Sequence, residues 1–467
     1  MTAPFVSVVV LNYNGLRFLD GCLGSLARLD YPQDRLEVLL VDNVSTDGSA
    51  DLAEKRFPWV RVVKNGRNLG FAAGNNVAMR STQAEFVALL NNDTVVDSQW
   101  LSGLVEAAER DPRVGACTSK LLFLHDRARV RLEAPTFRPS DFGSADQREL
   151  GIRLFSARVI QGSECREADP LDGFYGPEPS PDGPFHWSSG RASLGLPVIK
   201  SGGEATLLLR VSAPRATAEP VELKLSAGDR ILGEWSIGAA PVEVELPLPS
   251  SVLEGASPVV QNAGTLILSD GSGRDRGTIV RGTEVYQEDD LGQYDQREEV
   301  FAGCGAAILL RRTMLEDVGL FDEDFFMYYE DMDLSWRARR RGWKILYVPE
   351  AVVRHIHCGS SGEWSPLFLY HVERNRLLML AKNAPLALAA GEHARYALSA
   401  AANAARLARC LARGSPDTAA VAGRLRIQMR VLWWLLSHLP QTIAKRRQLA
   451  ARELVPAREL LRWMVSP

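Results

Sequence analysis

Phe5-Val-Ser-Val-Val-Val-Leu-Asn-Tyr-Asn-Gly15 opens the chain and indicates its architecture. The first seven residues are a largely β-branched run that is apolar except at Ser7, which is typical of a strand buried on both faces of a parallel sheet. The polar residues 12–15 end that strand in a loop, and a helix over roughly residues 16–27 follows. The segment therefore predicts the first strand and helix of an α/β domain.

The same pattern recurs three times along the chain. Strands are expected at residues 36–41, 60–63 and 86–90, each next to a polar or glycine-rich loop. Four successive βα units predict a parallel, doubly wound sheet, in which ligands bind beyond the carboxyl ends of the strands. The polar clusters 12–15, 42–43 and 91–94 fall at those ends. Each cluster alone is more often an ordinary turn, so it is their shared edge that indicates a ligand site.

Several classes of protein are disfavoured by features that the sequence lacks. Neither Gly-x-Gly-x-x-Gly after the first strand nor a Gly-Lys-Ser/Thr phosphate loop is present, which argues against nicotinamide dehydrogenases and P-loop enzymes. A net charge of −3 provides no general basic surface for nucleic acid. The six cysteines show no Cys-x-x-Cys spacing and fit reduced thiols. With no charged segment before the first strand, we expect a cytoplasmic protein.

A second polar feature lies far downstream, in Phe325-Phe-Met-Tyr-Tyr-Glu-Asp-Met-Asp-Leu-Ser-Trp-Arg-Ala-Arg-Arg-Arg-Gly-Trp343. Here Glu330 and Asp331 stand where an aromatic run passes into a helix that is expected to end near residue 341, with one buried face and one basic face. Carboxylates are favoured in the ionised form at a helix N-terminus, where they can accept a proton. For an isolated Glu-Asp pair, a plain acidic helix cap is the alternative.

Six motifs occur in a characteristic order: residues 6–15, 41–49, 68–76, 90–94, 303–312, and the Glu330-Asp331 helix followed by residues 348–355. Together they resemble the family 2 glycosyltransferases of the GT-A fold, and within them a bacterial rhamnosyltransferase-like group that builds cell-surface polysaccharides. The resemblance covers about residues 5–125 and 258–385. It implies a GT-A nucleotide-sugar-binding domain interrupted by an insertion.

The resemblance also implies roles for particular residues. Asp42 would hold the nucleobase, Asp93 would end the metal-binding motif, and Asp331, with Glu330 beside it, would be the catalytic base. The metal motif contains one carboxylate instead of two, so His355 is a candidate further ligand for Mg²⁺ or Mn²⁺. A lone histidine is more often structural, and His357 is the nearby alternative. The candidate nucleotide-sugar contacts are Asn12, Asn14, Asp42, Asn68, Gly74, Asn75 and Asn92.

The chain is expected to divide into four parts: residues 1–125 and 258–365 for the GT-A domain, 126–257 for the insertion, and 366–467 for a helical region. In the insertion, short β runs about ten residues apart predict an antiparallel sandwich or jelly roll. The rings of Phe185, Trp187 and Trp235 would either stack on sugars or lie in the sandwich core.

The helical region combines an apolar run at residues 431–436 with a basic cluster at 445–447. From residue 404 onward there are 12 Lys and Arg against 3 Asp and Glu. The apolar run is too short to span a bilayer, so peripheral binding to an anionic cytoplasmic leaflet is expected, with a polyprenyl-linked or glycan acceptor. A helical hairpin packed on the enzyme is the alternative.

The sequence thus predicts an inverting glycosyltransferase that moves a sugar from a nucleotide-sugar donor to a lipid-linked or glycan acceptor in bacterial cell-surface polysaccharide synthesis. The resemblance suggests dTDP-rhamnose as donor, while glucose, galactose, mannose and furanose donors stay open. Two other classes of protein are alternatives. A catalytically inactive sugar-nucleotide-binding protein would keep Asp42 and tolerate loss of Asp331, whereas a lectin-like adhesion module would depend on the insertion.

Overall fold

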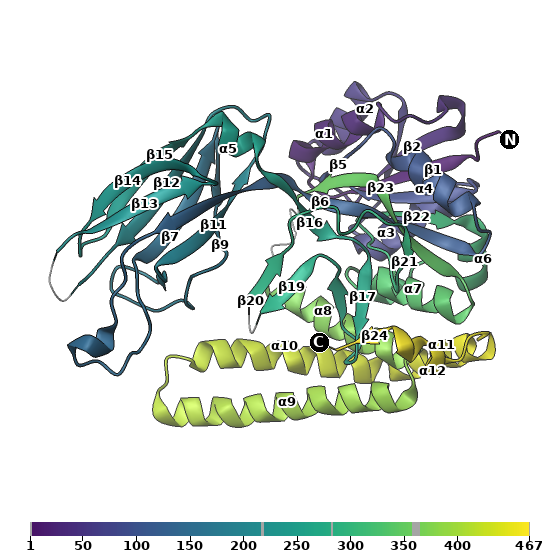
Figure 1. The fold of residues 1–467 in the computed structure, drawn as a ribbon. Helices are drawn as coiled ribbons and strands as arrows, with labels where there is room; N and C mark the ends of the chain where they lie inside the picture. Colours follow the sequence, from purple (N-terminus) through teal and green to yellow (C-terminus); the bar gives the residue numbers. More distant parts are fainter. Residues whose placement is uncertain (1, 216–218, 282–283, 357–364, 467) are drawn as a thin grey trace. The chain divides into compact units, whose positions relative to one another are not determined.

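The computed structural model describes residues 2–215, 219–281, 284–356 and 365–466 (Figure 1). The chain forms two compact units. Unit 1 comprises residues 1–122, 260–288 and 292–467, and unit 2 comprises residues 123–259 and 289–291. Unit 1 contains all of the candidate site residues.

Unit 1 is built on a mixed sheet in the order β3-β2-β1-β4-β22-β6. The first four strands are parallel, as the βα pattern predicted, and β22 runs antiparallel to both of its neighbours. Val8 and Val10 of β1 belong to one core cluster and Val9 to another, so both faces of the sheet are covered. These strands are β1 Val6–Asn12, β2 Leu36–Asp42, β3 Val60–Lys64, β4 Phe86–Asn91, β6 Val114–Glu133 (which continues into unit 2) and β22 Ala307–Arg311.

Helices that connect the strands supply the rest of the two cores. They are α1 Leu16–Leu26, α2 Ser49–Arg56, α3 Gly70–Ser81, α4 Trp100–Glu109, α6 Arg312–Val318 and α7 Glu330–Arg340. Shorter strands complete the unit: β5 Thr94–Val96, β16 Ser257–Asn262 at the boundary with unit 2, β17 Thr265–Leu268, β18 Gly273–Asp275, β19 Thr278–Arg281, β20 Glu284–Gln287, β21 Glu298–Glu299, β23 Lys344–His355 and β24 Met464–Val465. The antiparallel pairing of β5 with β23 sets His355 opposite Thr94.

The C-terminal helices are part of unit 1. One core cluster joins α7 to α8, α9 and α12 through residues such as Trp336, Met379 and Leu460. Figure 1 shows α9 and α10 side by side, and Asn403 donates to the Gln428 side chain between them (2.9 Å). Among the helices of the described ranges, none combines the length and apolarity needed to cross a membrane. The helices are α8 Pro366–Asn383, α9 Leu386–Arg413, α10 Thr418–Ser437, α11 Leu439–Ala451 and α12 Ala457–Leu460.

The basic face expected on α7 is wrong. Arg337, Arg339 and Arg340 are each only 5% exposed. Their guanidinium groups donate to backbone carbonyls and to carboxylates, including Glu453 of the segment after α11 (2.7 Å from Arg340). The sequence pattern placed the charges on one side of a helix, but it carried no information on the C-terminal segment that covers that side.

Unit 2 is a sandwich of two antiparallel sheets, which confirms the predicted all-β fold of the insertion. One sheet has the order β14-β13-β6-β11-β9 and the other β10-β7-β12-β15, with β8 on β7. Alternate residues of β12 are buried in the core between them. The elements are β7 Arg153–Gln161, β8 Glu164–Glu167, β9 Asp169–Pro170, β10 His186–Trp187, β11 Arg191–Val198, β12 Ala205–Ser212, β13 Val221–Ala227, β14 Arg230–Ile237, β15 Val242–Leu248 and α5 Ser250–Glu254.

The aromatic side chains considered for sugar stacking are packed inside unit 2. Phe185 and Trp187 are 3% and 5% exposed, and Trp235 packs against the main core cluster. The Arg153 guanidinium lies over the rings of Phe185 and Trp187, 4.6 and 4.8 Å from their centroids. These rings are therefore core residues, as the alternative reading of the sequence held.

Candidate active site

Three polar side chains form a ladder across the carboxyl ends of neighbouring strands. Asn12 donates to Asp42 Oδ1 (2.9 Å), and Asn92 donates to Asn12 Oδ1 (2.8 Å). The second oxygen of Asp42 accepts from the backbone N–H of Ser45 (3.0 Å). Because β2, β1 and β4 are adjacent and parallel, residues far apart in sequence meet at one edge.

The loop after β1 fits tightly against this ladder. A Cβ at Gly15 would lie 2.1 Å from Asn92 Nδ2 and 2.4 Å from Asn12 Oδ1, so only glycine leaves the ladder intact. Asn14 is exposed with φ 50°, and its Oδ1 accepts from the backbone N–H of Thr46 (2.8 Å). Asn12, Asn14, Asp42 and Asn92 are thus brought together.

The remaining candidate contacts lie on or just before α3. Asn68 is exposed and its Oδ1 accepts from the Gly70 N–H (2.9 Å). Gly74 and Asn75 are buried instead: a Cβ at Gly74 would come within 2.6 Å of Leu11, and Asn75 donates back to its own helix at Phe71 O (3.0 Å). The structure therefore places Gly74 and Asn75 in the packing of α3 and leaves Asn68 at the surface.

Asp93 and His355 face each other at the same edge. Their Oδ1 and Nε2 atoms are 3.1 Å apart, and both side chains are more than 90% buried. His355 Nδ1 lies 2.9 Å from Gln261 Oε1, and the Asn91 amide lies 3.3 Å from Nε2. If Nδ1 carries the proton that Gln261 accepts, the lone pair of Nε2 points at the carboxylate, as in a pair that shares a cation.

Within the part of the chain that the structure describes, no three His, Cys, Asp or Glu side chains gather closely enough to hold a metal ion by themselves. The pair of Asp93 and His355 offers one oxygen and one nitrogen ligand, so the remaining ligands would be water or substrate oxygens. His357, the alternative ligand, lies outside the described residues.

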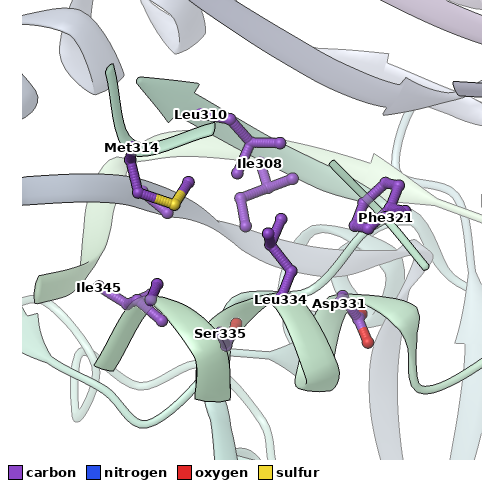
Figure 2. Close-up of a pocket in the computed structure, with 10 residues that line it drawn as sticks. Ile308, Leu310, Met314, Phe321, Asp331, Leu334, Ser335 and Ile345 are labelled. Atoms are coloured by element: carbon purple, nitrogen blue, oxygen red, sulfur yellow. The ribbon is translucent and has the colours of Figure 1, made fainter. Parts of the chain in front are cut away.

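Asp331 lies at the start of α7 with its carboxylate held by backbone donors. Its Oδ2 accepts from Gly305 N (2.8 Å) and its Oδ1 from Met332 N (2.7 Å). Figure 2 shows the carboxylate turned away from the apolar side chains, among them Ile308 and Leu334, that line a small gap between α7 and β22. Burial raises the pKa of Asp331, and the negative charge of Asp275 acts in the same direction. The residue retains partial exposure and can reach a bound molecule.

Glu330 has a different environment from its neighbour. It is 4% exposed, and its buried Oε2 has no hydrogen-bond partner. Burial, together with the adjacent Asp331 charge, holds the pKa of Glu330 well above the usual value for a glutamate. Burial favours the protonated form of Glu330, so the two adjacent acids differ in their access and in their surroundings.

The segment before α7 is strained. Phe326, Tyr328 and Tyr329 all have positive φ angles (64°, 68° and 68°), which residues other than glycine rarely adopt. Phe326, with ψ −63°, is the centre of a γ-turn closed by the Met327 N–H to Phe325 O bond (2.8 Å). We call residues 325–329 the strained loop. Conformations of this kind cost about 1–3 kcal/mol per residue and cluster at functional sites.

The strained loop touches α3 through its backbone. Phe326 O accepts from the N–H groups of Phe71 (2.6 Å) and Ala72 (3.0 Å). A Cβ at Gly70, where φ is 74°, would lie 2.6 Å from that carbonyl oxygen. Gly70 is thus needed both for its conformation and for the close approach, which explains a glycine of the 68–76 motif that sequence reasoning left without a role.

Other residues at the site carried no recognisable signal in the sequence. Gln261 and Asp275 come from the segment that follows the insertion, and Asp275 Oδ1 accepts from Asn262 (2.7 Å). Gly305 stands within the 303–312 motif, but its backbone donor role depends on where α7 begins. A glutamine, an aspartate or a glycine in a loop has many ordinary uses, so only the fold distinguishes these.

The sheet and the polar residues at the carboxyl ends of its strands identify a GT-A domain, the class that binds nucleotide-sugars, with an inserted β-sandwich. Two family models agree: "Glycosyl transferase family 2" matches residues 7–156, and "Glycosyltransferase like family 2" matches residues 284–376. The chain belongs to the family 2 glycosyltransferases. The two matched segments contain every candidate site residue between them.

Characterised relatives match over shorter stretches. The chain is 47% identical over 58 residues to the N-acetylglucosaminyl-diphospho-decaprenol L-rhamnosyltransferase of Mycobacterium tuberculosis, covering 12% of this chain and 19% of that protein. It is 30% identical over 103 residues to the glycosyltransferase AglE of Haloferax volcanii, covering 21% of this chain and 34% of that protein. A structure of Staphylococcus aureus TarS 1–349 with UDP-GlcNAc is 25% identical over 26% of this chain and 39% of that chain, with a TM-score of 0.24. The chain thus spans about a fifth and about a third of the length of these two curated relatives.

Proposed function

We propose that the chain transfers a sugar, with inversion at the anomeric carbon, from a nucleotide-sugar donor to an acceptor hydroxyl. The observation that carries this proposal is the Asp331 carboxylate: it is partly exposed, aimed by two backbone N–H groups, and free of any cation that would neutralise it among the contacts resolved around it. It belongs to the same unit as the Asp42 ladder and the Asp93–His355 pair.

On the donor side, we assign the nucleobase to Asp42 and its partners Asn12 and Asn92, with Asn14 and Asn68 as exposed amides nearby. A buried carboxylate that already accepts two hydrogen bonds keeps a fixed orientation toward a base edge. The resemblance to rhamnosyltransferases favours dTDP-rhamnose as the donor. Gly74 and Asn75 would act through the packing of α3, without touching the ligand.

Asp93 and His355 would hold the divalent cation, Mg²⁺ or Mn²⁺, and the geometry of the pair fits such an ion. A bound ion would neutralise charge on the leaving diphosphate. For their part, Gln261 fixes the His355 ring through Nδ1, and the pairing of β5 with β23 fixes the position of both ligands. With a single carboxylate in the pair, water or substrate oxygens would complete the coordination.

Asp331 would accept the proton of the acceptor hydroxyl as that oxygen attacks the anomeric carbon opposite the diphosphate. Its raised pKa brings the carboxylate closer to the working pH, where a general base is most effective. Glu330 is buried, so we assign it no direct part in proton transfer. Attack from the face opposite the leaving group gives inversion.

A panel of nucleotide-sugars, assayed with the full chain and Mg²⁺ or Mn²⁺, tests this function. Release of nucleoside diphosphate from one donor, lost in Asp331→Asn while that donor still binds in calorimetry, supports an enzyme. Binding without turnover for every donor, unaffected by Asp331→Asn, would instead indicate an inactive sugar-nucleotide-binding protein. Retained glycan binding by a variant that no longer binds nucleotide-sugar would favour a lectin-like module.

We also propose that the chain lies on the cytoplasmic face of a cell membrane and uses a lipid-linked acceptor. The exposed face of α10 supports this proposal. Met429, Trp433 and Leu436 are 54%, 69% and 70% exposed, and helical spacing puts them on one side together with exposed Arg426. A face of this composition suits the boundary of an anionic bilayer, where each arginine contributes about 1 kcal/mol.

The basic cluster at 445–447 contributes less to this surface than its sequence suggested. Lys445 is paired with Asp322 and Asp324 (2.6 and 2.7 Å), and Arg446 donates to the carbonyls of Ala381 and Ala384 at the end of α8. These residues therefore attach α11 to the rest of unit 1, as in the packed-helix alternative. Membrane binding would depend on the face of α10 instead.

Sedimentation with anionic liposomes tests the membrane proposal without truncating the chain. Wild-type protein should pellet with the vesicles at low salt and less so at high salt. Trp433→Ser should reduce the pelleted fraction, while Trp59→Ser, which removes a 43% exposed tryptophan elsewhere in unit 1, should not. Wild-type protein that stays in the supernatant at low salt would contradict a membrane role.

A further inference from the structure

The strained loop is bound along one face of α8. The Phe368 ring meets the edge of Tyr328 (centroids 5.1 Å apart), and His371 stacks on Phe326 (5.2 Å). Asn375 follows one turn later on the same side. Spacings of three and four residues put these three side chains on a single stripe of the helix, directed at the loop.

Asn375 binds the loop backbone directly and is itself fully buried. Its side-chain nitrogen lies 2.9 Å from Phe325 O, 2.7 Å from Met327 O and 2.7 Å from Tyr328 O. Its oxygen accepts from Arg374 Nε (2.8 Å), which fixes the orientation of the amide. The side-chain amide of Asn375 thus stabilises three neighbouring carbonyl oxygens of the turn, which would otherwise repel one another.

Arg374 reinforces the same contact from the neighbouring position. The Nη2 atom of its guanidinium group donates to Asp324 O (2.8 Å) and Phe325 O (2.7 Å). On the other side of the loop, Phe326 O is bound by the first N–H groups of α3. The loop is therefore held between α8 and α3, and a strained conformation persists only where its surroundings hold it in this way.

The loop ends at Tyr329, whose carbonyl accepts the Asp333 N–H (2.9 Å) and begins α7. Asn375 is therefore connected to Asp331 through the strained loop and the first turn of α7, and the two side chains need not touch each other. If the carbonyls were released, the γ-turn at Phe326 could relax. The start of α7 would then move relative to Gly305, the backbone donor that aims the carboxylate.

We propose that Asn375 is a positioning residue for sugar transfer, whose carboxamide N–H₂ holds the strained loop in the conformation that aims the Asp331 carboxylate. The inference rests on the proposed role of Asp331. It means that α8 helps to set the position of the proposed base.

Asn375→Asp is the decisive variant because it keeps size and shape and replaces the donor with an acceptor. Its carboxylate can still pair with Arg374, but its other oxygen faces three carbonyl oxygens. We expect kcat to fall on the order of 10²-fold, as for a displacement of about 1 Å at a reacting group, with the KM for the donor nearly unchanged. Asn375→Ala should be no more harmful than the aspartate variant. A role in filling volume alone would reverse that order.

Gln428→Leu is the matched control. Gln428 is also a fully buried carboxamide of the C-terminal helices, and its hydrogen bonds join it to Asn403 and Ser399 of α9 instead of the strained loop. It should lose stability comparable to the Asn375 variants and keep its kcat. A parallel loss of kcat in Gln428→Leu would reduce the role of Asn375 to general stability and overturn the proposal.

Two further readouts separate this proposal from the proposed function itself. Hydrogen exchange of the Phe71, Ala72 and Met327 amides should accelerate in Asn375→Asp, and this readout requires no activity. Unchanged exchange would overturn the clamp, whereas a wild-type protein that transfers no sugar would overturn the function and leave the clamp intact. In an active enzyme, the acid limb of the kcat profile should also shift in Asn375→Asp, because both the hydrogen bond from Gly305 and the burial of the carboxylate affect the pKa of Asp331.

Discussion

Replacing Asp331 with asparagine tests the proposed base most directly. The substitution removes the proton acceptor while it keeps side-chain size, and loss of a general base reduces rate by roughly 10²–10⁴-fold. At 1.36 kcal/mol per tenfold change in rate, this corresponds to about 2.7–5.4 kcal/mol of transition-state stabilisation. The structure adds a second effect. Both carboxylate oxygens accept from backbone N–H groups, so the NH₂ of asparagine must face one of these donors, Gly305 N or Met332 N.

The lost hydrogen bond should destabilise the folded protein by about 1–3 kcal/mol, and removal of a partly buried charge acts in the opposite direction. The melting temperature should therefore change little while kcat falls sharply, with donor binding retained in calorimetry. Glu330→Gln is the control, since it makes the same kind of substitution at the adjacent buried acid, which has no direct role in our proposal. Asp331→Asn turnover within about tenfold of wild type would refute the base assignment.

Three more predictions concern the metal pair, the buried ion pairs and pH. His355→Ala should raise the Mn²⁺ concentration needed for half-maximal activity and Mn²⁺ binding should weaken in calorimetry; full activity in excess chelator would contradict the metal site. Lys382→Met should lower the free energy of unfolding by about 3 kcal/mol in urea titrations. This value is at the low end for a broken buried ion pair, because the two aspartates that Lys382 contacts keep other cations. Lys64→Met, which removes an exposed ion pair, should leave the unfolding midpoint unchanged. The pKa of Glu330 is raised in the folded state, so above the ordinary pKa near 4.5 folding takes up a proton and the protein loses stability as pH rises. Glu330→Gln should therefore raise the melting temperature more at pH 8 than at pH 4, and an equal change at both pH values would contradict the raised pKa.

The sheet and the edge that carries the proposed donor site could be predicted from the sequence because both depend on local patterns. Continuous β-branched runs imply buried parallel strands, and parallel strands bring their carboxyl ends together whatever lies between them. Asp93 and His355 meet for a different reason: Asp93 follows β4, and His355 ends β23, which pairs antiparallel with β5 immediately after Asp93. Asp331 stands at the start of a helix, where a helical pattern and an acidic residue locate it.

Contacts between surfaces could not be predicted in this way. The sequence pattern marks the arginines of α7 and Lys445 as charged, but it does not reveal which carbonyls or carboxylates cover them. Asn375 donates to carbonyl oxygens that lie 47 to 50 residues away in sequence, in a loop whose positive φ angles occur at Phe and Tyr. Neither periodicity nor residue propensity predicts such a turn, because propensity favours glycine there.

The distance in sequence between the strained loop and its supports has a consequence for synthesis of the protein. Lys445 pairs with Asp324 across 121 residues, which a ribosome takes roughly 6–24 s to add. The strand ends that carry Asp42 and Asp93 leave the ribosome long before that, whereas the loop emerges without the helices that hold it. On a nascent chain, the proposed donor-binding edge can therefore form well ahead of the proposed base, and a chain arrested before Asn375 would have the strand-end ladder without a fixed Asp331.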